Sequence, residues 1–395
     1  MALTSHGLSA LADLQPSAQS TQRDAPAATV SSESTSSLFI SGARAVDGSH
    51  VGVLFDDEAR LVATLPLPSR AHGAAGHRAS KKAVIFSRRP GYFMSAFTLS
   101  DPDKQLQISA QKGRHFYGHG VFSLSGDVLY ATENDYDQSR GVLGVYDAAH
   151  AYRRLGELET GGIGPHEVIG IPGTNLLVVA NGGIETHPDS GRDKLNLDTM
   201  QASIALIDAG TGRIVGRHVL AQDMQEMSIR HLAYAGEGKV WFACQYQGSH
   251  PVLQGLAGYI CLNETMRSYS GTVSAAGLGL VSLPDALQAR TQQYLSSVAV
   301  MGDSVLYTSS RGGVVFSIDR HTHAVREIAS VMDCSGVAAA QSSMSDSKTA
   351  NNADSESVHS SIVTSGAGDV VQISSKGSLD LAHHRLQWDN HLYRI

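Results

Sequence analysis

The chain has 395 residues, 40 of them glycine, and a formal net charge of −7 with 17% charged residues. No cluster of Lys and Arg alternates with aromatic residues, so the sequence does not favour a nucleic-acid partner. Numerous glycines together with 42% hydrophobic residues favour short strands and tight turns over a helical bundle. We therefore expect an all-β protein, and without a run of ~18 apolar residues we predict no transmembrane segment.

Residues 1–37 are rich in Ser, Ala, Thr, Gln and Pro, a composition typical of a disordered segment. They contain no basic stretch followed by an apolar one, so no export signal is visible. The three cysteines, Cys244, Cys261 and Cys334, are widely spaced and form no C-x-x-C pair. This pattern excludes a disulfide framework and a cysteine zinc site, and favours cysteines that are buried as small hydrophobic residues.

A unit of four short strands repeats along the chain. Its clearest copy has predicted strands at residues 119–126, 128–132, 141–147 and 154–159, with a Ser-Gly turn between the first two. His72, His119 and His166 stand at equal intervals, within the ~40–50 residues typical of a propeller blade. A polar loop at 183–201 lengthens the next blade before His231. A Ser- and Asp-rich stretch at 341–358 is interpreted as a flexible insertion.

Two later blades open at residues 297–302 and 336–340, and residues 389–395 supply one more opening strand with no chain left to complete its blade. The three missing strands are predicted at residues 38–43, 51–55 and 60–65. Pairing of the two ends would close the ring and remove an exposed sheet edge. We therefore predict that residues 38–395 form one seven-bladed β-propeller, and we expect a monomer.

Five of the seven blades open on a histidine. The first strand of a blade lies nearest the axis, so its opening residue faces one mouth of the central channel. His72, His119, His166, His231 and His391 take this position, and Ser297 and Gly336 take the other two. A single histidine is more often a core residue, but five at equivalent positions favour a functional ring.

The second strands return to the same mouth, where they end on polar residues. We predict the five histidines and Glu133 as metal ligands. A second group is predicted to contact a bound ligand: Arg89, Asn181, Arg230, Gln245 and Arg311. Arg88, Asn134, Gln247 and Glu167 lie nearby, and His187, Asp189, Arg192 and Lys194 of the 183–201 loop are placed to cover the mouth.

Two kinds of site fit this set of residues. Neutral imidazoles with a carboxylate suit iron, copper or zinc, whereas protonated imidazoles with arginines would hold an anion. With an ordinary histidine pKa of ~6.5, metal uptake would fall as the pH drops through that value, and anion binding would strengthen.

Several strings resemble the domain of unknown function 1513 family of bacterial propellers over about residues 37–395. They are FYGHGVFS at 116–123, TEND at 132–135, GGIGPHE at 161–167, ANGGIETHPD at 180–189, SIRHLA at 228–233, SSRGG at 309–313 and WDNH at 388–391. The repeat is also similar to surface-protein propellers of the YVTN type. The resemblance implies a periplasmic location and iron-uptake partners, because members often carry a twin-arginine signal and are encoded beside imelysin-type proteins. No activity follows from it, and this chain lacks the twin-arginine leader.

Three functions therefore stay open. The ring and the resemblance favour a periplasmic protein that binds iron or copper for uptake. The same channel mouth could be the active site of an enzyme, either a metal-dependent redox enzyme or a lactonase-like hydrolase. The third possible function is a protein-docking scaffold, in which the residues at the channel mouth have only a structural role.

Overall fold

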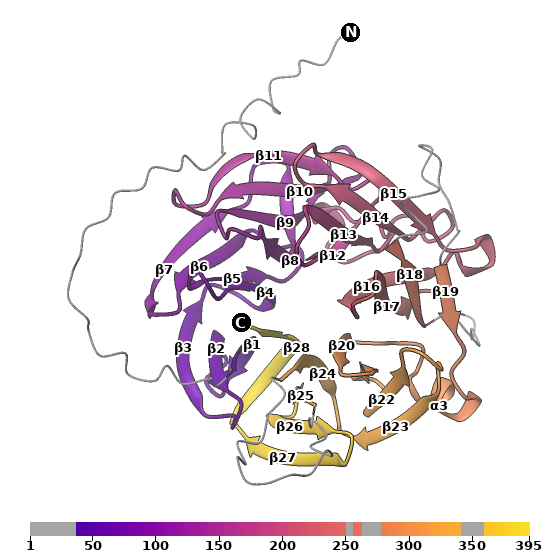
Figure 1. The fold of residues 1–395 in the computed structure, drawn as a ribbon. Coiled ribbons are helices and arrows are strands. Elements are labelled where there is room, and N and C mark those ends of the chain that lie inside the picture. Colours follow the sequence, from indigo (N-terminus) through magenta and orange to yellow (C-terminus); the bar gives the residue numbers. More distant parts are fainter. Residues whose placement is uncertain (1–36, 250–255, 263–277, 341–358) are drawn as a thin grey trace.

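Seven four-stranded antiparallel sheets surround one axis in the computed structural model, which describes residues 37–249, 256–262, 278–340 and 359–395 (Figure 1). The predicted seven-bladed propeller is confirmed. Residues 1–36 and the predicted insertion at 341–358 lie outside the described residues. In the described part of the chain, no helix has the length and apolar character needed to cross a membrane.

Each blade runs from an innermost to an outermost strand. In that order, the seven blades are β28 (Leu386–Arg394), β1 (Leu38–Ala45), β2 (His50–Asp56) and β3 (Leu61–Leu67); β4 (Ala71–His77), β5 (Lys82–Ser87), β6 (Phe93–Thr98) and β7 (Asp101–Ser109); β8 (Arg114–Phe122), β9 (Val128–Asp135), β10 (Arg140–Asp147) and β11 (Arg153–Glu159); β12 (Pro165–Gly170), β13 (Leu176–Asn181), β14 (Ser203–Asp208) and β15 (Arg213–Val219); β16 (Met227–Tyr234), β17 (Lys239–Tyr246), β18 (Ala257–Cys261) and β19 (Leu278–Val281); β20 (Ser297–Met301), β21 (Ser304–Ser309), β22 (Val314–Asp319) and β23 (Val325–Ser330); β24 (Cys334–Ala339), β25 (Ser360–Ser365), β26 (Asp369–Ser374) and β27 (Gly377–His383). Short helical elements are η1 (Pro188–Ser190), η2 (Gln222–Met224) and α3 (Asp285–Arg290).

The core lies between neighbouring blades. Strands in the middle of a blade, such as β9, are buried along their whole length, whereas the outermost strand β27 is largely exposed. One cluster joins Trp241 and Phe242 of one blade to Tyr307 and Phe316 of the next. Because the clusters lie between blades, each sheet packs against its neighbours on both sides.

Ring closure joins the two ends of the chain. Strand β28 pairs with β1, with Phe39 opposite Arg394 and Ala43 opposite Trp388, as predicted. The Trp388 ring packs against Phe55 at a centroid distance of 5.2 Å. Its Nε1–H donates to the carbonyl of Gly368 in the neighbouring blade at 3.2 Å. The closing strand is therefore held within its own blade and by the blade beside it.

Innermost strands leave regular antiparallel register close to the axis. The register shifts lie between Ala71 and Ala74 in β4, Phe116 and Gly120 in β8, Pro165 and Glu167 in β12, Ile229 and His231 in β16, Trp388 and Leu392 in β28, and Cys334 and Gly336 in β24. Strand β20, which carries Ser297, pairs regularly. Each of the five predicted histidines lies within or beside a shift, and such bulges bend a strand and redirect its side chains.

Replacing Trp388 with alanine tests the closure. Trp388 is 3% exposed, so the variant leaves a cavity beside Phe55 and removes the hydrogen bond to Gly368. We expect Trp388→Ala to lower the free energy of unfolding by about 3–5 kcal/mol in urea denaturation. The control Val46→Ala, at a residue that is 78% exposed, should change it by less than about 0.5 kcal/mol. Equal effects of the two substitutions would contradict the observed closure.

Candidate functional site

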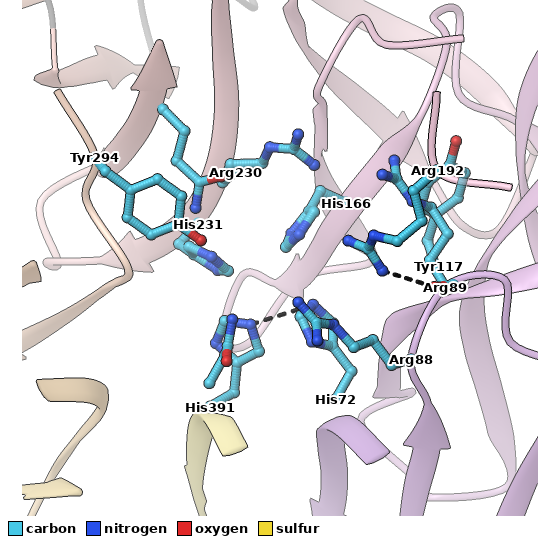
Figure 2. Close-up of a pocket in the computed structure, with 12 residues that line it drawn as sticks. His72, Arg88, Arg89, Tyr117, His166, Arg192, Arg230, His231, Tyr294 and His391 are labelled. Atoms are coloured by element: carbon cyan, nitrogen blue, oxygen red, sulfur yellow. Dashed lines mark hydrogen bonds between the residues drawn. The ribbon is translucent and has the colours of Figure 1, made fainter. Parts of the chain in front are cut away.

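Five imidazoles meet on the propeller axis, one from each of β4, β8, β12, β16 and β28. Ring centroids lie 4.4 Å apart for His72 and His391 and 6.2 Å apart for His166 and His391, and seven further pairs fall between these values. Figure 2 shows four of the rings converging. The structure thus brings together all five histidines of the predicted ring, and we call them the histidine cluster.

The histidine cluster is buried inside the channel, which corrects the predicted position at its mouth. The five residues are only 3–8% exposed. His119 and His391 are each the sixth residue of their strand rather than its opening residue. The inner strands begin before the histidines, and the bulges then turn the side chains toward the axis.

Local backbone features make this convergence possible. Gly118 has a φ of +101°, and a Cβ built there would lie 2.5 Å from Cδ2 of His72. A side chain at this position would therefore be strained and would push His72 aside. Hydroxyl groups from the second strands satisfy the backbone freed by the bulges. The Thr132 hydroxyl donates to the carbonyl of His119 at 3.1 Å, and that of Ser41 to the carbonyl of His391 at 2.7 Å.

The ring nitrogens form two overlapping groups of three. Ligand atoms of His72, His119 and His391 lie within 4.8 Å of one another, as do those of His119, His166 and His231. Nδ1 of His72, Nε2 of His119 and Nδ1 of His166 are buried and have no hydrogen-bond partner among the described residues. Buried polar atoms normally have a partner, so each of these orphaned nitrogens calls for an explanation.

Glu167 stands behind two of these rings. Its Oε2 lies 3.3 Å from Nδ1 of His231, and its Oε1 lies 3.8 Å from Nδ1 of His119. The contact with His231 is a hydrogen bond, which holds the hydrogen on Nδ1 of His231 and leaves its Nε2 to face outward, as for histidines that bind metals; the contact with His119 is too long for a hydrogen bond. Burial raises the pKa of Glu167, but the hydrogen bond from His231 and the nearby His119 keep the pKa below its ordinary value. Glu167 is therefore ionised.

Burial keeps four of the five imidazoles neutral. Desolvation is the main cause that lowers the pKa of His72, His166 and His391 well below 6.5, and it lowers that of His119 to about 4. The ordinary value assumed from the sequence is therefore wrong for these four residues. At neutral pH these four imidazoles are uncharged, and the uncharged form is the one that binds metals. An anion site that depends on their protonation is therefore not supported.

An arginine-lined pocket of about 80 Å³ opens on one side of the histidine cluster (Figure 2). Its lining consists of His72, Arg88, Arg89, Tyr117, His166, Arg192, Arg230, His231, Gln245, Tyr294, Asn390 and His391. Arg89, Arg230 and Gln245 were predicted as ligand contacts, and the structure places them together in this pocket. Arg192 reaches the pocket from the 183–201 loop and donates to the carbonyl of Arg89 at 3.0 Å. No carboxylate of the described residues contributes to this lining.

Three predicted site residues lie elsewhere. Glu133 is fully buried but accepts hydrogen bonds from Tyr146 at 2.5 Å and Arg154 at 2.9 Å, within its own blade. Its carboxylate therefore points away from the histidine cluster, which corrects its prediction as a metal ligand. The Asn181 amide donates to the carbonyl of Thr160 at 2.9 Å and serves the packing of β13. Arg311 does not line the pocket.

Sequence reasoning missed several residues of the pocket wall. Tyr117 and Asn390 each stand shortly before a ring histidine, on the mouth side of the same strand, and this position was the available signal. Tyr294 precedes β20 in a connection with no repeat pattern. The Arg311 guanidinium lies 4.3 Å from the Tyr294 ring centroid, and that of Arg89 lies 5.7 Å from the ring of Tyr117.

The opposite half of the channel has a different character. His119 and Glu167 line a larger space of about 360 Å³ whose remaining walls are mostly small or apolar residues of the inner strands, such as Ala74 and Val337. All inner strands run in one direction along the axis, so their starts meet at the arginine side and their ends at this side. The histidine cluster lies between the two halves.

The fold and the cluster define a seven-bladed propeller with a histidine-lined axis. The family model "Protein of unknown function (DUF1513)" matches residues 65–395, and the chain belongs to this family. No curated protein matches the sequence. Similar solved structures include Kuenenia stuttgartiensis hydrazine synthase (TM-score 0.49, 14% identity, 68% of this chain and 70% of that one), a nidogen/laminin complex (0.49, 13%, 75% and 93%) and BamB from Moraxella catarrhalis (0.48, 11%, 87% and 86%).

The lowered pKa values predict a loss of stability in acid. In the unfolded chain His119 is protonated below pH ~6.5, whereas in the folded chain it is protonated only below about pH 4. Its contribution to stability is therefore fully present above pH ~6.5 and is lost as the pH falls from ~6.5 to about 4. This residue alone should lower the free energy of unfolding by about 2 kcal/mol at pH 5 relative to pH 7.5. We expect His119→Gln to show a correspondingly weaker acid dependence in urea denaturation. His150→Gln, at a side chain that is 76% exposed, is the control. The same pH dependence in His119→Gln and the parent would show that His119 is not buried and neutral.

Proposed function

We propose that this protein binds one divalent transition-metal ion inside its channel, through ring nitrogens of His119, His166 and His231. The observation that carries the proposal is a group of three histidines whose ligand atoms lie within 4.8 Å of one another, in which His119 and His166 each have an orphaned ring nitrogen and Glu167 is hydrogen-bonded to His231. Nitrogens bound to one ion at about 2.0–2.1 Å lie at most about 4.2 Å apart, so the three rings would move slightly closer together around an ion. The ion would supply the partner that the buried nitrogens lack.

The other group of three is less suited to an ion. Nε2 of His391 and Nε2 of His72 lie 3.2 Å apart and share a hydrogen bond (Figure 2). Binding an ion through both of these atoms would break that bond. In the favoured group, Glu167 already orients His231 through a hydrogen bond, and Nε2 of His119 has no hydrogen-bond partner among the described residues.

Neutral imidazole suits iron, copper, zinc and nickel. Iron and copper are the first candidates in our proposal, because the family resemblance implies iron-uptake partners and a periplasmic location. Three protein ligands would leave at least one coordination position open, and the arginine-lined pocket is adjacent to it.

The lactonase-like alternative has lost its main support. Such a site asks for several carboxylate or amide ligands around a hard cation. Of the two carboxylates predicted near the mouth, Glu133 is engaged with Arg154. Glu167 is then the carboxylate that remains at the histidine cluster.

Metal uptake tests the proposal directly. We expect the purified chain without a His-tag, titrated with Zn²⁺ or Cu²⁺ in a calorimeter at pH 7.5, to bind one ion. His119→Ala combined with His166→Ala should abolish uptake, because it removes two of the three ligands. His150→Ala combined with His383→Ala changes the same number of histidines at exposed side chains and should leave uptake intact.

A milder variant separates the ligands from the group that orients them. Glu167→Gln keeps all three imidazoles but weakens the acceptor behind His231, so we expect affinity to fall by about 10–100-fold. Glu159→Gln, at a side chain that is 72% exposed, is its control. If the double histidine variant binds metal as the parent does, the cluster is structural and the docking-scaffold alternative is preferred.

A further inference from the structure

The arginine-lined pocket concentrates positive charge, and no carboxylate of the described residues lies in its lining. Arg88, Arg89, Arg192 and Arg230 all line it, and within the described part of the chain none of them forms an ion pair. By contrast, the partly buried arginines of the β8–β11 blade all pair with carboxylates; these are Arg114, Arg140 and Arg154. Four unpaired guanidinium groups around one small space repel one another unless an anion lies between them.

The deepest of these residues is Arg230. It is 8% exposed, and its Nε has no hydrogen-bond partner among the residues that the structure describes. Burial first, and then the charge of Arg89, lower the pKa of Arg230 to about 10; burial, Arg70 and Arg192 do the same for Arg88. Both remain charged at neutral pH, and a buried charge without a counter-ion is costly.

The shape of the pocket limits what can enter. A volume of about 80 Å³ holds only a few water-sized groups, since one water needs about 10–15 Å³ measured in this way. Tyr117 and Tyr294 form parts of its walls, and the cation–π contacts of Arg89 and Arg311 hold these rings in place. Arg192 is exposed at the rim, so the pocket is reached from solvent on that side.

We propose that this pocket binds a compact oxyanion of phosphate or carboxylate type that carries at least two negative charges. Guanidinium groups present planar pairs of N–H donors that match the oxygens of both kinds of anion. The inference goes beyond the metal proposal, because the four arginines take no part in holding the ion. His166 and His231 also line the pocket, so an anion bound there would adjoin a metal in the cluster, and each would strengthen binding of the other.

Calorimetry on the metal-free chain tests the anion site independently of the metal. At pH 7.5 and low ionic strength, we expect inorganic phosphate or malonate to bind at one site per chain, and more tightly than chloride. The tighter of the two identifies the ligand as phosphate or carboxylate chemistry. Arg89→Gln combined with Arg192→Gln should weaken binding at least tenfold, because it removes two donors at the partly exposed rim without disturbing the core.

Two further variants complete the test, one as a matched control and one at the buried end of the pocket. Arg153→Gln combined with Arg213→Gln removes the same charge from exposed positions on outer strands and should leave anion affinity unchanged. Arg230→Met keeps the apolar volume at the pocket floor, and its anion affinity should also fall at least tenfold if its melt shows a folded protein. Absence of phosphate and malonate binding, or equal losses in the rim and outer-strand variants, would overturn the inference. Failure of metal binding would leave this test unaffected.

Discussion

The pairing of β28 with β1 does more than close the ring. Strand β28 also carries Asn390 and His391, and the bulge in this strand turns His391 toward His72, where the two Nε2 atoms lie 3.2 Å apart. The last strand of the chain is thus the inner wall of its blade and one side of the histidine cluster. Because the cluster needs all five inner strands, ring closure and assembly of the site are the same structural event.

The channel is organised as electrostatic layers. Arginines and tyrosines lie on one side, the imidazoles form the middle, and Glu167 with small apolar residues lies on the other. Orphaned imidazole nitrogens and unpaired guanidinium groups both destabilise the fold when nothing is bound. Proteins tolerate such local violations mainly where they serve function. A cation in the middle layer and an anion in the arginine-lined pocket would relieve both at once.

The periodic part of the structure was predictable from the sequence. Equal spacing of His72, His119 and His166 reflects a repeat that every blade must satisfy to fit the ring, so blade number and closure followed from it. The histidine positions followed as well, since they lie on the same strand of each blade. Their depth did not, because a bulge of one or a few residues leaves no mark in the hydrophobic pattern.

The remaining errors in the predicted site concern residues whose positions are not determined by the repeat. Glu133 and Asn134 are adjacent in β9 and point to opposite faces, so a sequence pattern alone does not say which one faces the axis. In the structure neither lines the pocket, and Glu133 is directed to Arg154 by charge pairing within the blade. Arg192 and Tyr294 reach the pocket from connections between strands, where no repeat fixes their position. Glu167 was visible beside His166, but its role depends on contacts with His231 in the next blade.

Anomalous scattering from crystals grown with Zn²⁺ or Co²⁺ and measured at the absorption edge of the metal tests the central claim most directly. We predict one strong peak on the propeller axis, about 2.0–2.2 Å from ring nitrogens of His119, His166 and His231. A channel without a peak, with metal found only at the carboxylates Asp56, Asp57 and Glu58, would contradict the proposed site.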